Sequence, residues 1–377
     1  MGENLMKTSE HRRWSLRAVS AIAAGVTIAG AGFAVTGATA ALADTAPACQ
    51  PAGASGFTAA VVATRGQSIA HRTVDATGCD VGIYVDAPWV TIDRVTVTGA
   101  NAAGILVENT AHITVTRSTV TGNGFHAPAA PEPPGTPPTT GQLDQAFAIS
   151  LFGVSHATVS RNTVYNNGRG GIGVMDNGPF DPGRVVGLPT YAHNIPVNDV
   201  TVTRNALWSN FAGCAIVVSA FNTGNTVSHV AITRNTIRQG AQPFGPTGPD
   251  VGGIVAQSNG VASTVSDILI SRNRVTDSGE GGVIVHAAAA GSMTKHVTVT
   301  RNVLAGNGWL SAPQTMGVVV DSRVIPADLG QANVDTVVTR NVISDEFFGI
   351  WTQGPDAPAI SRNSITVTPG GAAVHMQ

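Results

Sequence analysis

The chain has 377 residues, of which 12% are charged, and a formal net charge of −2. So few and so balanced charges predict neither nucleic acid nor an anionic membrane surface as a partner. Hydrophobic residues make up 43% of the chain and aromatic residues 5%, with Ala, Val, Gly and Thr dominant, which favours slim stacked strands over helices.

The first 43 residues have the composition of an export signal. Positive charge in HRRWSLR (residues 11–17) precedes an apolar stretch from Ala18 to Ala38, and a small-x-small cleavage tripeptide stands directly before Asp44. A retained membrane anchor is the alternative, because about 20 apolar residues can span a bilayer. Arg12-Arg13 resembles a twin-arginine signal, which leaves the choice between that route and the general secretory route open. We expect residues 1–43 to be a signal peptide and the mature chain to be extracellular, with no membrane partner after cleavage.

Three cysteines suit an oxidising compartment. Cys49 and Cys79 lie near the start of the mature chain, where a disulfide would limit fraying, and we expect them to be bonded. Cys214 stands in the apolar phrase GCAIVV and is interpreted as a small buried hydrophobe that keeps its thiol. No Cys/His spacing indicates zinc.

From residue 94 onwards a phrase with an arginine inside alternating Val and Thr recurs, as in VTVTRNVL at residues 297–304. The shortest steps between these arginines are 22 and 23 residues, and longer steps carry insertions. Such a period predicts a solenoid in which each repeat is one coil. The nine arginines are Arg94, Arg117, Arg161, Arg204, Arg234, Arg272, Arg301, Arg340 and Arg362.

Each period also contains a second phrase, GIxV, as in GIYV at residues 82–85 and GVIV at residues 282–285. Alternation over four to eight residues between Gly and Asn is typical of strands. A coil therefore has one strand at GIxV, one at VTVT, and a third short strand after the Arg-Asn bend. No amphipathic helix separates them. We expect an N-terminal cap over residues 44–73 and a β-helix domain over residues 74–377.

An asparagine follows the arginine in seven of the nine coils. Asn tolerates the left-handed backbone that a sharp bend needs, so we assign this conformation to the asparagines. Stacked at ~4.8 Å, their amides can also hydrogen-bond from coil to coil as a ladder. The seven are Asn162, Asn205, Asn235, Asn273, Asn302, Asn341 and Asn363.

These repeats resemble those of the right-handed parallel β-helix proteins of the pectin-lyase-like superfamily, over about residues 74–370. The resemblance implies an all-β, single-stranded right-handed parallel β-helix of about nine coils with an internal asparagine ladder. That superfamily includes polysaccharide lyases, glycoside hydrolases, uronan epimerases, phage tailspikes and adhesins, so no single activity follows. The paired aspartates of polygalacturonases and the Lys- and Arg-bearing motifs of pectate lyases are missing here, which disfavours pectin.

The arginine column allows two interpretations. A line of like charges could bind a polyanion such as a uronan. Alternatively, each guanidinium donates to carbonyls at the corner while its stem covers neighbouring side chains. The surrounding threonines and the coupling to Asn favour the second interpretation.

Insertions flank the GIxV strands on both sides and would form a trough along this sheet, a concave site that suits a polymer. One of them, residues 126–145, carries six prolines and is predicted to be a stiff or disordered flap. The trough predicts a polysaccharide or glycan as partner. Oligomeric state cannot be predicted.

The residue four positions after the first residue of each GIxV phrase begins a turn or points outward. Here Gln257, His286, Asp321 and Gln353 follow one another on consecutive coils. A carboxylate beside an imidazole can orient it for acid–base work, so we predict His286, Asp321 and the nearby Glu280 as catalytic residues. Predicted substrate-binding residues are Gln257, Gln353, Asp176, Asp345 and Glu346.

No cofactor is predicted, although Asp176, Asp181 and Asp321 could hold Ca²⁺ with backbone carbonyls. Two functions remain. The first is a secreted carbohydrate-active protein, of lyase, hydrolase or epimerase type, acting on an extracellular polysaccharide. The second is a non-catalytic glycan-binding or structural surface protein. The concentration of His, Asp and Glu beside long loops favours the first, because a scaffold does not need it.

Overall fold

A computed structural model of the chain describes residues 48–53, 57–124, 147–168, 170–176, 196–210, 213–239, 252–308, 314–322, 330–354 and 356–377. They belong to the second of two compact units, Thr45–Gln377. The predicted signal peptide and the proline-rich 126–145 insertion lie outside the described residues. Within the described ranges the secondary structure consists of strands, and no helix there is long and apolar enough to cross a membrane.

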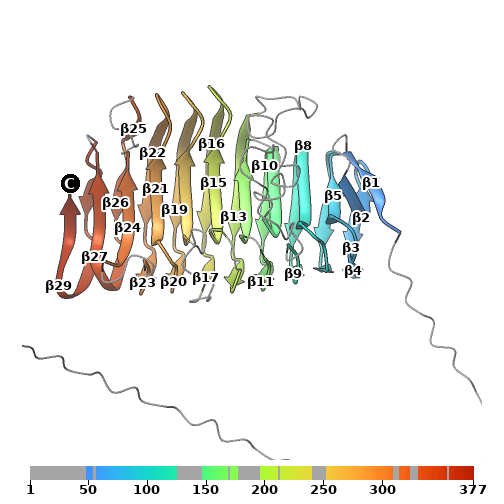
Figure 1. The fold of residues 1–377 in the computed structure, drawn as a ribbon, viewed down its shortest axis with the longest axis horizontal. Coiled ribbons are helices and arrows are strands. Elements are labelled where there is room, and N and C mark those ends of the chain that lie inside the picture. The colour runs from blue at the N-terminus through green and yellow to red at the C-terminus, as the bar shows by residue number, and fades with distance from the viewer. Residues whose placement is uncertain are drawn as a thin grey trace, which may run out of the picture. The chain divides into compact units, whose positions relative to one another are not determined.

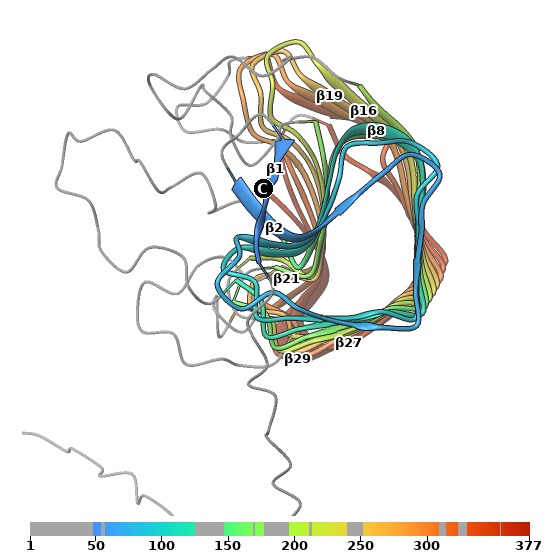
Figure 2. The same cartoon turned by 90° about the vertical axis from the view of Figure 1, so that its right-hand side faces the viewer.

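The described part of this unit is a parallel β-helix whose coils stack along one axis (Figure 1). Seen down that axis, each coil encloses a core between three faces (Figure 2). The first face is built by the GIxV strands, which pair in parallel from coil to coil. They are β2 (Phe57–Ala63), β5 (Val81–Val85), β8 (Ala103–Thr116), β10 (Ile149–Ser160), β12 (Ile172–Met175), β15 (Ile216–Ala220), β18 (Ile254–Ser258), β21 (Gly281–Ala287), β24 (Met316–Asp321), β27 (Val342–Gln353) and β29 (Ser364–Met376).

The second face contains the VTVT strands, and β8 and β10 run on from the first face into it. Its other strands are β3 (Ser68–Ala70), β6 (Thr91–Asp93), β13 (Val197–Thr203), β16 (Thr226–Thr233), β19 (Thr264–Ser271), β22 (Met293–Thr300), β25 (Ala332–Val334), β26 (Val337–Thr339) and β28 (Ala359–Ser361).

The third face consists of three-residue strands and of the beginnings of β27 and β29. The short strands are β4 (Thr73–Asp75), β7 (Thr96–Thr98), β9 (Thr119–Thr121), β11 (Thr163–Tyr165), β14 (Ala206–Trp208), β17 (Thr236–Arg238), β20 (Arg274–Thr276) and β23 (Val303–Ala305).

The N-terminal end of the stack differs from the sequence-based boundary. Strand β1 (Gln50–Ala52) pairs antiparallel with β2, but β2, β3 and β4 already pair in parallel with the next coil. All three strands of a coil therefore begin within residues 44–73, the range assigned to the cap. The arginine pattern does not mark this coil because His71 occupies the position that Arg94 takes in the next one, with nearly the same left-handed backbone. The predicted disulfide joins Cys49 to Cys79 and ties the chain before β1 to this coil.

The left-handed residue at the Arg-Asn bend is the arginine, so the assignment of this conformation to the asparagine was wrong. All nine arginines have φ between 51° and 59°, whereas the following asparagines do not have positive φ. The arginine turns the chain and its side chain stays outside. The residue after it then points into the coil, which is why a polar amide is buried there.

The predicted asparagine ladder is confirmed. In the middle of the stack, Asn205 Nδ2 donates to Asn235 Oδ1 at 3.0 Å and to the Val159 carbonyl at 3.0 Å. Its own Oδ1 accepts the backbone N–H and the Nδ2 of Asn162 at 2.9 and 3.0 Å. Every donor and acceptor of the buried amide is thus used, as buried polar groups require. The same bonds repeat up to Asn363.

A second ladder, which the sequence analysis did not predict, stands at the corner between the third and first faces. Asn123 donates to Asn167 at 3.0 Å, and Asn167 donates to Asn210 at 2.9 Å. Near the other end of the stack, Asn307 donates through its backbone N–H and its Nδ2 to Glu346 Oε1, at 2.8 and 3.0 Å. Each member comes six residues after an arginine of the column, so this ladder can be recognised in the sequence from that spacing.

The first-face glycine makes room for this second ladder. A Cβ at Gly282 would lie 3.0 Å from Asn307 Nδ2, a member of this ladder, and 2.8 Å from the Gly317 carbonyl of the next coil. The glycine of the GIxV phrase is thus required by the close approach of the backbone to its neighbour.

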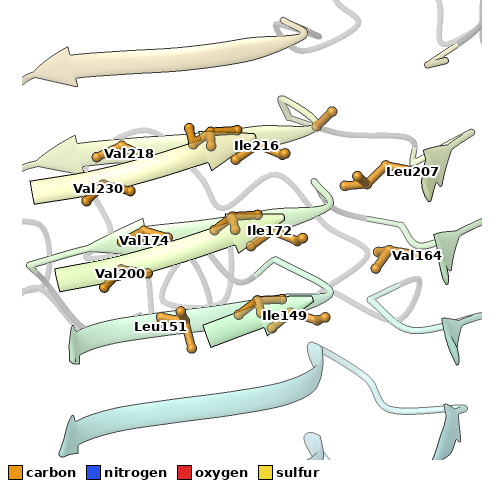
Figure 3. Packing of buried hydrophobic residues seen from close by; sticks show 14 of the residues in the cluster. Ile149, Leu151, Val164, Ile172, Val174, Val200, Leu207, Ile216, Val218 and Val230 are labelled. Carbon is orange, nitrogen blue, oxygen red and sulfur yellow. The ribbon is translucent and has the colours of Figure 1, made fainter. Parts of the chain in front are cut away.

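The core consists of equivalent apolar residues stacked from coil to coil. Figure 3 shows Ile149, Ile172 and Ile216 in one row and Leu151, Val174 and Val218 in the next, and all six are completely or almost completely buried. Burial of each such side chain stabilises the fold by about 1.5–3 kcal/mol. Because every coil offers the same small branched residues at the same places, neighbouring coils fit without large aromatic side chains.

A column of one Trp and several His and Asp side chains lies outside, at the corner between the first and second faces. Each member stands five residues before an arginine and has a left-handed backbone. Trp89 stacks on His112 with ring centroids 3.8 Å apart, and His296 Nδ1 lies 3.1 Å from Asp267 Oδ1. Burial acts to raise the pKa of Asp267, but hydrogen bonds from Ser266 and His296 and the nearby imidazoles lower it overall. The column is Trp89, His112, His156, Asp199, His229, Asp267, His296 and Asp335.

We predict that Asn273→Ala reduces the free energy of unfolding by about 1–3 kcal/mol, because amide partners in the coils above and below lose their bonds inside the core. Thermal and denaturant unfolding measure this directly. Asn259→Ala serves as the control, since its side chain belongs to neither ladder. Equal melting temperatures for wild type and Asn273→Ala would rule out a stabilising ladder at this coil.

Candidate functional site

The polar side chains predicted on consecutive GIxV strands are in register. Gln257 pairs with His286, His286 with Asp321, and Asp321 with Gln353. All four are partly exposed on the outer side of the first face. Parallel strands hold equivalent residues ~4.8 Å apart, so one polar row crosses four coils.

His286 and Asp321 are in contact. The imidazole Nδ1 lies 3.4 Å from Asp321 Oδ2, and the side chains are 25% and 20% exposed. An imidazole oriented through Nδ1 by a carboxylate presents its Nε2 for proton transfer. The predicted pair is therefore assembled in a half-buried environment.

A depression of about 380 Å³ surrounds this pair. It contains all three predicted catalytic residues, since Glu280 directly before β21 lines it together with His286 and Asp321. Gln257 also lines it, whereas Gln353 lies one coil further on. The remaining lining residues are Cys214, Val255, Ile284, Met316 and Val319.

The floor of the depression is apolar, formed by the outward-facing residues of β18, β21 and β24. Towards the N-terminus the same outer row continues as a second hydrophobic cluster, in which Phe152 and Met175 are 1% exposed. The depression thus lies where the outer row of the first face changes from apolar to polar side chains. A few polar groups over an apolar floor are typical of ligand sites.

Cys214 lies at the edge of the depression, not inside the core as expected from its apolar neighbours. It is partly exposed and forms no disulfide, and its sulfur accepts the backbone N–H of Gly252 at 3.3 Å. The sequence signal was ambiguous because Cys214 comes just before the inward and outward alternation of β15 begins.

Asp176 is placed away from the depression. It is 5% exposed, and its two carboxylate oxygens accept the backbone N–H groups of Phe221 and Asn222 at 2.7 and 3.1 Å. Burial raises the pKa of Asp176 although these hydrogen bonds act against the shift. Its visible role is to hold the turn after β15 in the next coil.

Asp345 and Glu346 lie at the corner between the third and first faces. Asp345 is exposed, with a left-handed backbone. Glu346 is fully buried and is the last member described in the second ladder. Burial raises the pKa of Glu346 to about 7, against the opposing hydrogen bonds from Asn307. The geometry thus makes Glu346 part of the interior, where a polymer in the trough does not reach it.

Glu108 is a buried carboxyl group four residues after the start of the GILV phrase, the position that His286 takes in a later coil. It is 5% exposed and accepts a hydrogen bond from the Tyr84 hydroxyl at 3.0 Å. Burial raises its pKa to about 7. In the sequence, only the apolar residues 105–107 directly before Glu108 indicated that it is buried.

No group of three or more His, Cys, Asp or Glu side chains arranged to hold a metal ion occurs in the described ranges. Of the predicted calcium ligands, Asp181 lies outside those ranges, and Asp176 already uses both oxygens on backbone N–H groups. Calcium binding remains a prediction.

Comparison with known proteins addresses the fold. The family model described as "Right handed beta helix region" matches residues 59–304, more than half of the chain. The chain belongs to the right-handed beta helix family. This confirms the predicted all-β, right-handed parallel β-helix.

Two solved structures illustrate the similarity. The A-module of the mannuronan C-5 epimerase AlgE4 from Azotobacter vinelandii is 16% identical, with a TM-score of 0.48, over 84% of this chain and 74% of that one. XylC in complex with xylose is 13% identical, with a TM-score of 0.43, over 77% of this chain and 38% of that one. The chain thus spans less than half of XylC, and at these identities the likeness concerns the fold alone. A search of curated proteins found no match.

The raised pKa of Glu346 predicts a pH-dependent stability. Because the folded pKa of about 7 exceeds the ordinary value of 4.5, the stabilisation from this group is complete below about pH 4.5 and is lost as the pH rises through 7. Relative to wild type, Glu346→Gln should therefore gain stability between pH 5 and pH 8, by at most roughly 3 kcal/mol. Urea unfolding at both pH values measures the gain.

The control is Asp345→Asn, which removes an exposed carboxylate next to Glu346. Glu108 is present in all three proteins, so its own pH dependence cancels in the comparison. A wild type and a Glu346→Gln variant with parallel pH profiles would show that Glu346 titrates normally.

Proposed function

We propose that this protein is a secreted enzyme that uses acid–base chemistry on an extracellular polysaccharide in the depression of the first face. The observation that carries the proposal is the His286–Asp321 contact at 3.4 Å in a half-buried depression that Glu280 also lines. His286 and Glu280 can both transfer protons and both line a depression with an apolar floor. A coil with a purely structural role does not require such an arrangement. Secretion is supported by the composition of residues 1–43 and by the Cys49–Cys79 disulfide.

The charge of the depression favours hydrolysis over the lyase and epimerase reactions. Of the described residues, two acidic side chains and no Lys or Arg line it. A sugar carboxylate there would face Glu280 and Asp321, and the anion formed by proton abstraction beside that carboxylate would meet no basic side chain of this set. Cleavage of a glycosidic bond between neutral sugars needs an acid and a base, which these residues can supply.

In this reaction Glu280 gives its proton to the glycosidic oxygen as the bond from that oxygen to the anomeric carbon breaks. A water molecule adds to the anomeric carbon, and His286 Nε2 accepts the proton that the water loses. Asp321 orients the imidazole through Nδ1 and balances its positive charge. Gln257, which pairs with His286 in register, would hydrogen-bond a sugar hydroxyl in this proposal.

We predict that Glu280→Gln, His286→Asn and Asp321→Asn each reduce the rate at least 100-fold, the lower end of what acid–base groups contribute, while melting normally. The assay is release of reducing ends from a panel of neutral and acidic polysaccharides, read together with the absorbance of unsaturated products. Reducing ends without unsaturation are expected.

The matched control is the double variant Asp267→Asn/His296→Asn, which removes a similar Asp–His contact in the exposed column outside the depression. Its rate should equal that of wild type. Near wild-type rates in all three site variants would refute the assignment, and unsaturated products would indicate elimination. Saturable glycan binding without turnover would support the alternative, a non-catalytic glycan-binding protein.

A further inference from the structure

The arginine column at the corner between the second and third faces is chemically uniform, unlike the other two corners. The left-handed backbone there suits Gly and Asn better than a long side chain. The other two corners use varied residues, among them Gly78, Asp267 and Asn166. Nine arginines at one corner are therefore not a requirement of the backbone, which indicates that the guanidinium itself is used.

Most of this column is exposed and not neutralised. Arg94 and Arg117 share the carboxylate of Asp93, at 3.2 and 2.7 Å. In later coils Ser or Thr replaces this aspartate directly before the arginine. The seven arginines from Arg161 to Arg362 are exposed, and their guanidiniums make no ion pair or carbonyl hydrogen bond within the described ranges. The expected donation to corner carbonyls is thus not found there.

The charges stand on a rigid support. The backbone N–H of Arg161 donates to the Thr203 carbonyl of the next coil, and that of Arg204 donates to Thr233, both at 3.1 Å. Successive coils are ~4.8 Å apart, so the seven guanidiniums form a straight line of regularly spaced positive charge. An extended polymer of sugar acids carries one carboxylate on each sugar and matches such a line in charge and in periodicity.

An aromatic pair lies on the third face, at the ends of β11 and β14 that are farther from the arginine column. Tyr165 and Trp208 come four residues after Arg161 and Arg204, on the outer side of β11 and β14. Their rings stack with centroids 4.7 Å apart, and Trp208 is 37% exposed. An exposed aromatic ring offers an apolar surface to the face of a sugar. The net charge of −2 opposes general attraction of nucleic acid.

We propose that the arginine column from Arg161 to Arg362, with the Tyr165–Trp208 pair, is a binding surface for an acidic polysaccharide that lies along the helix axis. The column is at a different corner of the coil from the Glu280 depression, and none of its residues lines that depression. The inference therefore does not depend on the reaction proposed for the depression, and binding without turnover tests it.

The test compares the binding of polygalacturonate to the full mature protein and to Arg204→Asn/Arg234→Asn/Arg272→Asn, at 50 mM salt, by calorimetry. Because Asn suits a left-handed corner, the triple variant should fold at least as stably as wild type. We expect its affinity to fall about 10-fold or more, as removal of three charge contacts implies. The corresponding triple Lys variant should keep most of the affinity, and wild-type binding should weaken steeply with salt.

The matched control is Arg65→Gln/Arg72→Gln/Lys295→Gln, which changes the net charge equally but leaves the nine arginines intact. It should bind as wild type does. Equal losses in the two charge-removing variants would overturn the proposal, as would a failure of wild type to bind polygalacturonate. Tighter binding of wild type to single-stranded DNA or to phosphatidylserine vesicles would overturn it as well. Unfolding of the Asn variant would show that the arginine stems are structural.

Discussion

The fold depends on one buried amide group being used completely in each of the seven coils that carry a ladder asparagine. A ladder asparagine gives two hydrogen bonds from Nδ2 and accepts two at Oδ1, so a group that would be costly inside the core becomes a connection between three coils. The hydrogen bonds of Asn205 with Asn162, Asn235 and Val159 show this arrangement for one coil. Because Nδ2 reaches both neighbouring coils, it fixes their register as well as their spacing.

Register at the inner corner determines what the outer surface can do. Because the coils are in register, residues at equivalent positions of successive coils form straight columns on the outer surface. His286 reaches Asp321 on the next coil in this way, and so does His296 reach Asp267. The outer columns then differ only in side-chain chemistry. Stacked guanidiniums repel by ~1 kcal/mol per neighbour in water before salt screening, a cost that an anionic ligand would remove.

If both proposals hold, the two surfaces would select for different chemical groups. Glu280 and Asp321 make the depression unfavourable for a sugar acid, whereas the arginine column favours one. A polymer that contains both neutral and acidic sugars would satisfy both surfaces. One part of such a polymer would be held at the corner while a neutral segment occupies the depression. Phe152 and Met175, in the same outer row, would not contact the polymer because both are buried in the second hydrophobic cluster.

Periodicity in the sequence was sufficient for the fold and for the site row. Counting four residues from each GIxV start placed His286 beside Asp321, because strand register is a one-dimensional property that spacing can reveal. Spacing alone did not show which corner residues point outward to solvent and which point inward to the core. Glu346 looked like an exposed acid beside Asp345, but one residue after a left-handed corner it points inward. Likewise Asp176 is occupied by a turn 45 residues further along the chain, which no local pattern indicates.

Burial of a polar side chain is a second property that the repeat pattern does not reveal. Glu108 stands at the same position in its coil as His286 does, yet it is nearly inaccessible. It pairs with Phe152 and bonds to Tyr84, both members of the second hydrophobic cluster. In the seven bends that contain both residues, the arginine has the left-handed backbone that intrinsic preference would give to the asparagine. Asn is the better left-handed residue, but only Asn can satisfy the buried ladder, so the arginine takes the strained backbone outside.

Residue-resolved hydrogen exchange of the intact chain tests the central claim most directly. If the ladder holds the coils in register, the backbone N–H groups of Asn162, Asn205, Asn235, Asn273, Asn302 and Asn341, which donate to the next amide oxygen at 2.9 Å, will be among the slowest in the protein to exchange. Exchange at these six positions as fast as in the exposed turns would contradict the account.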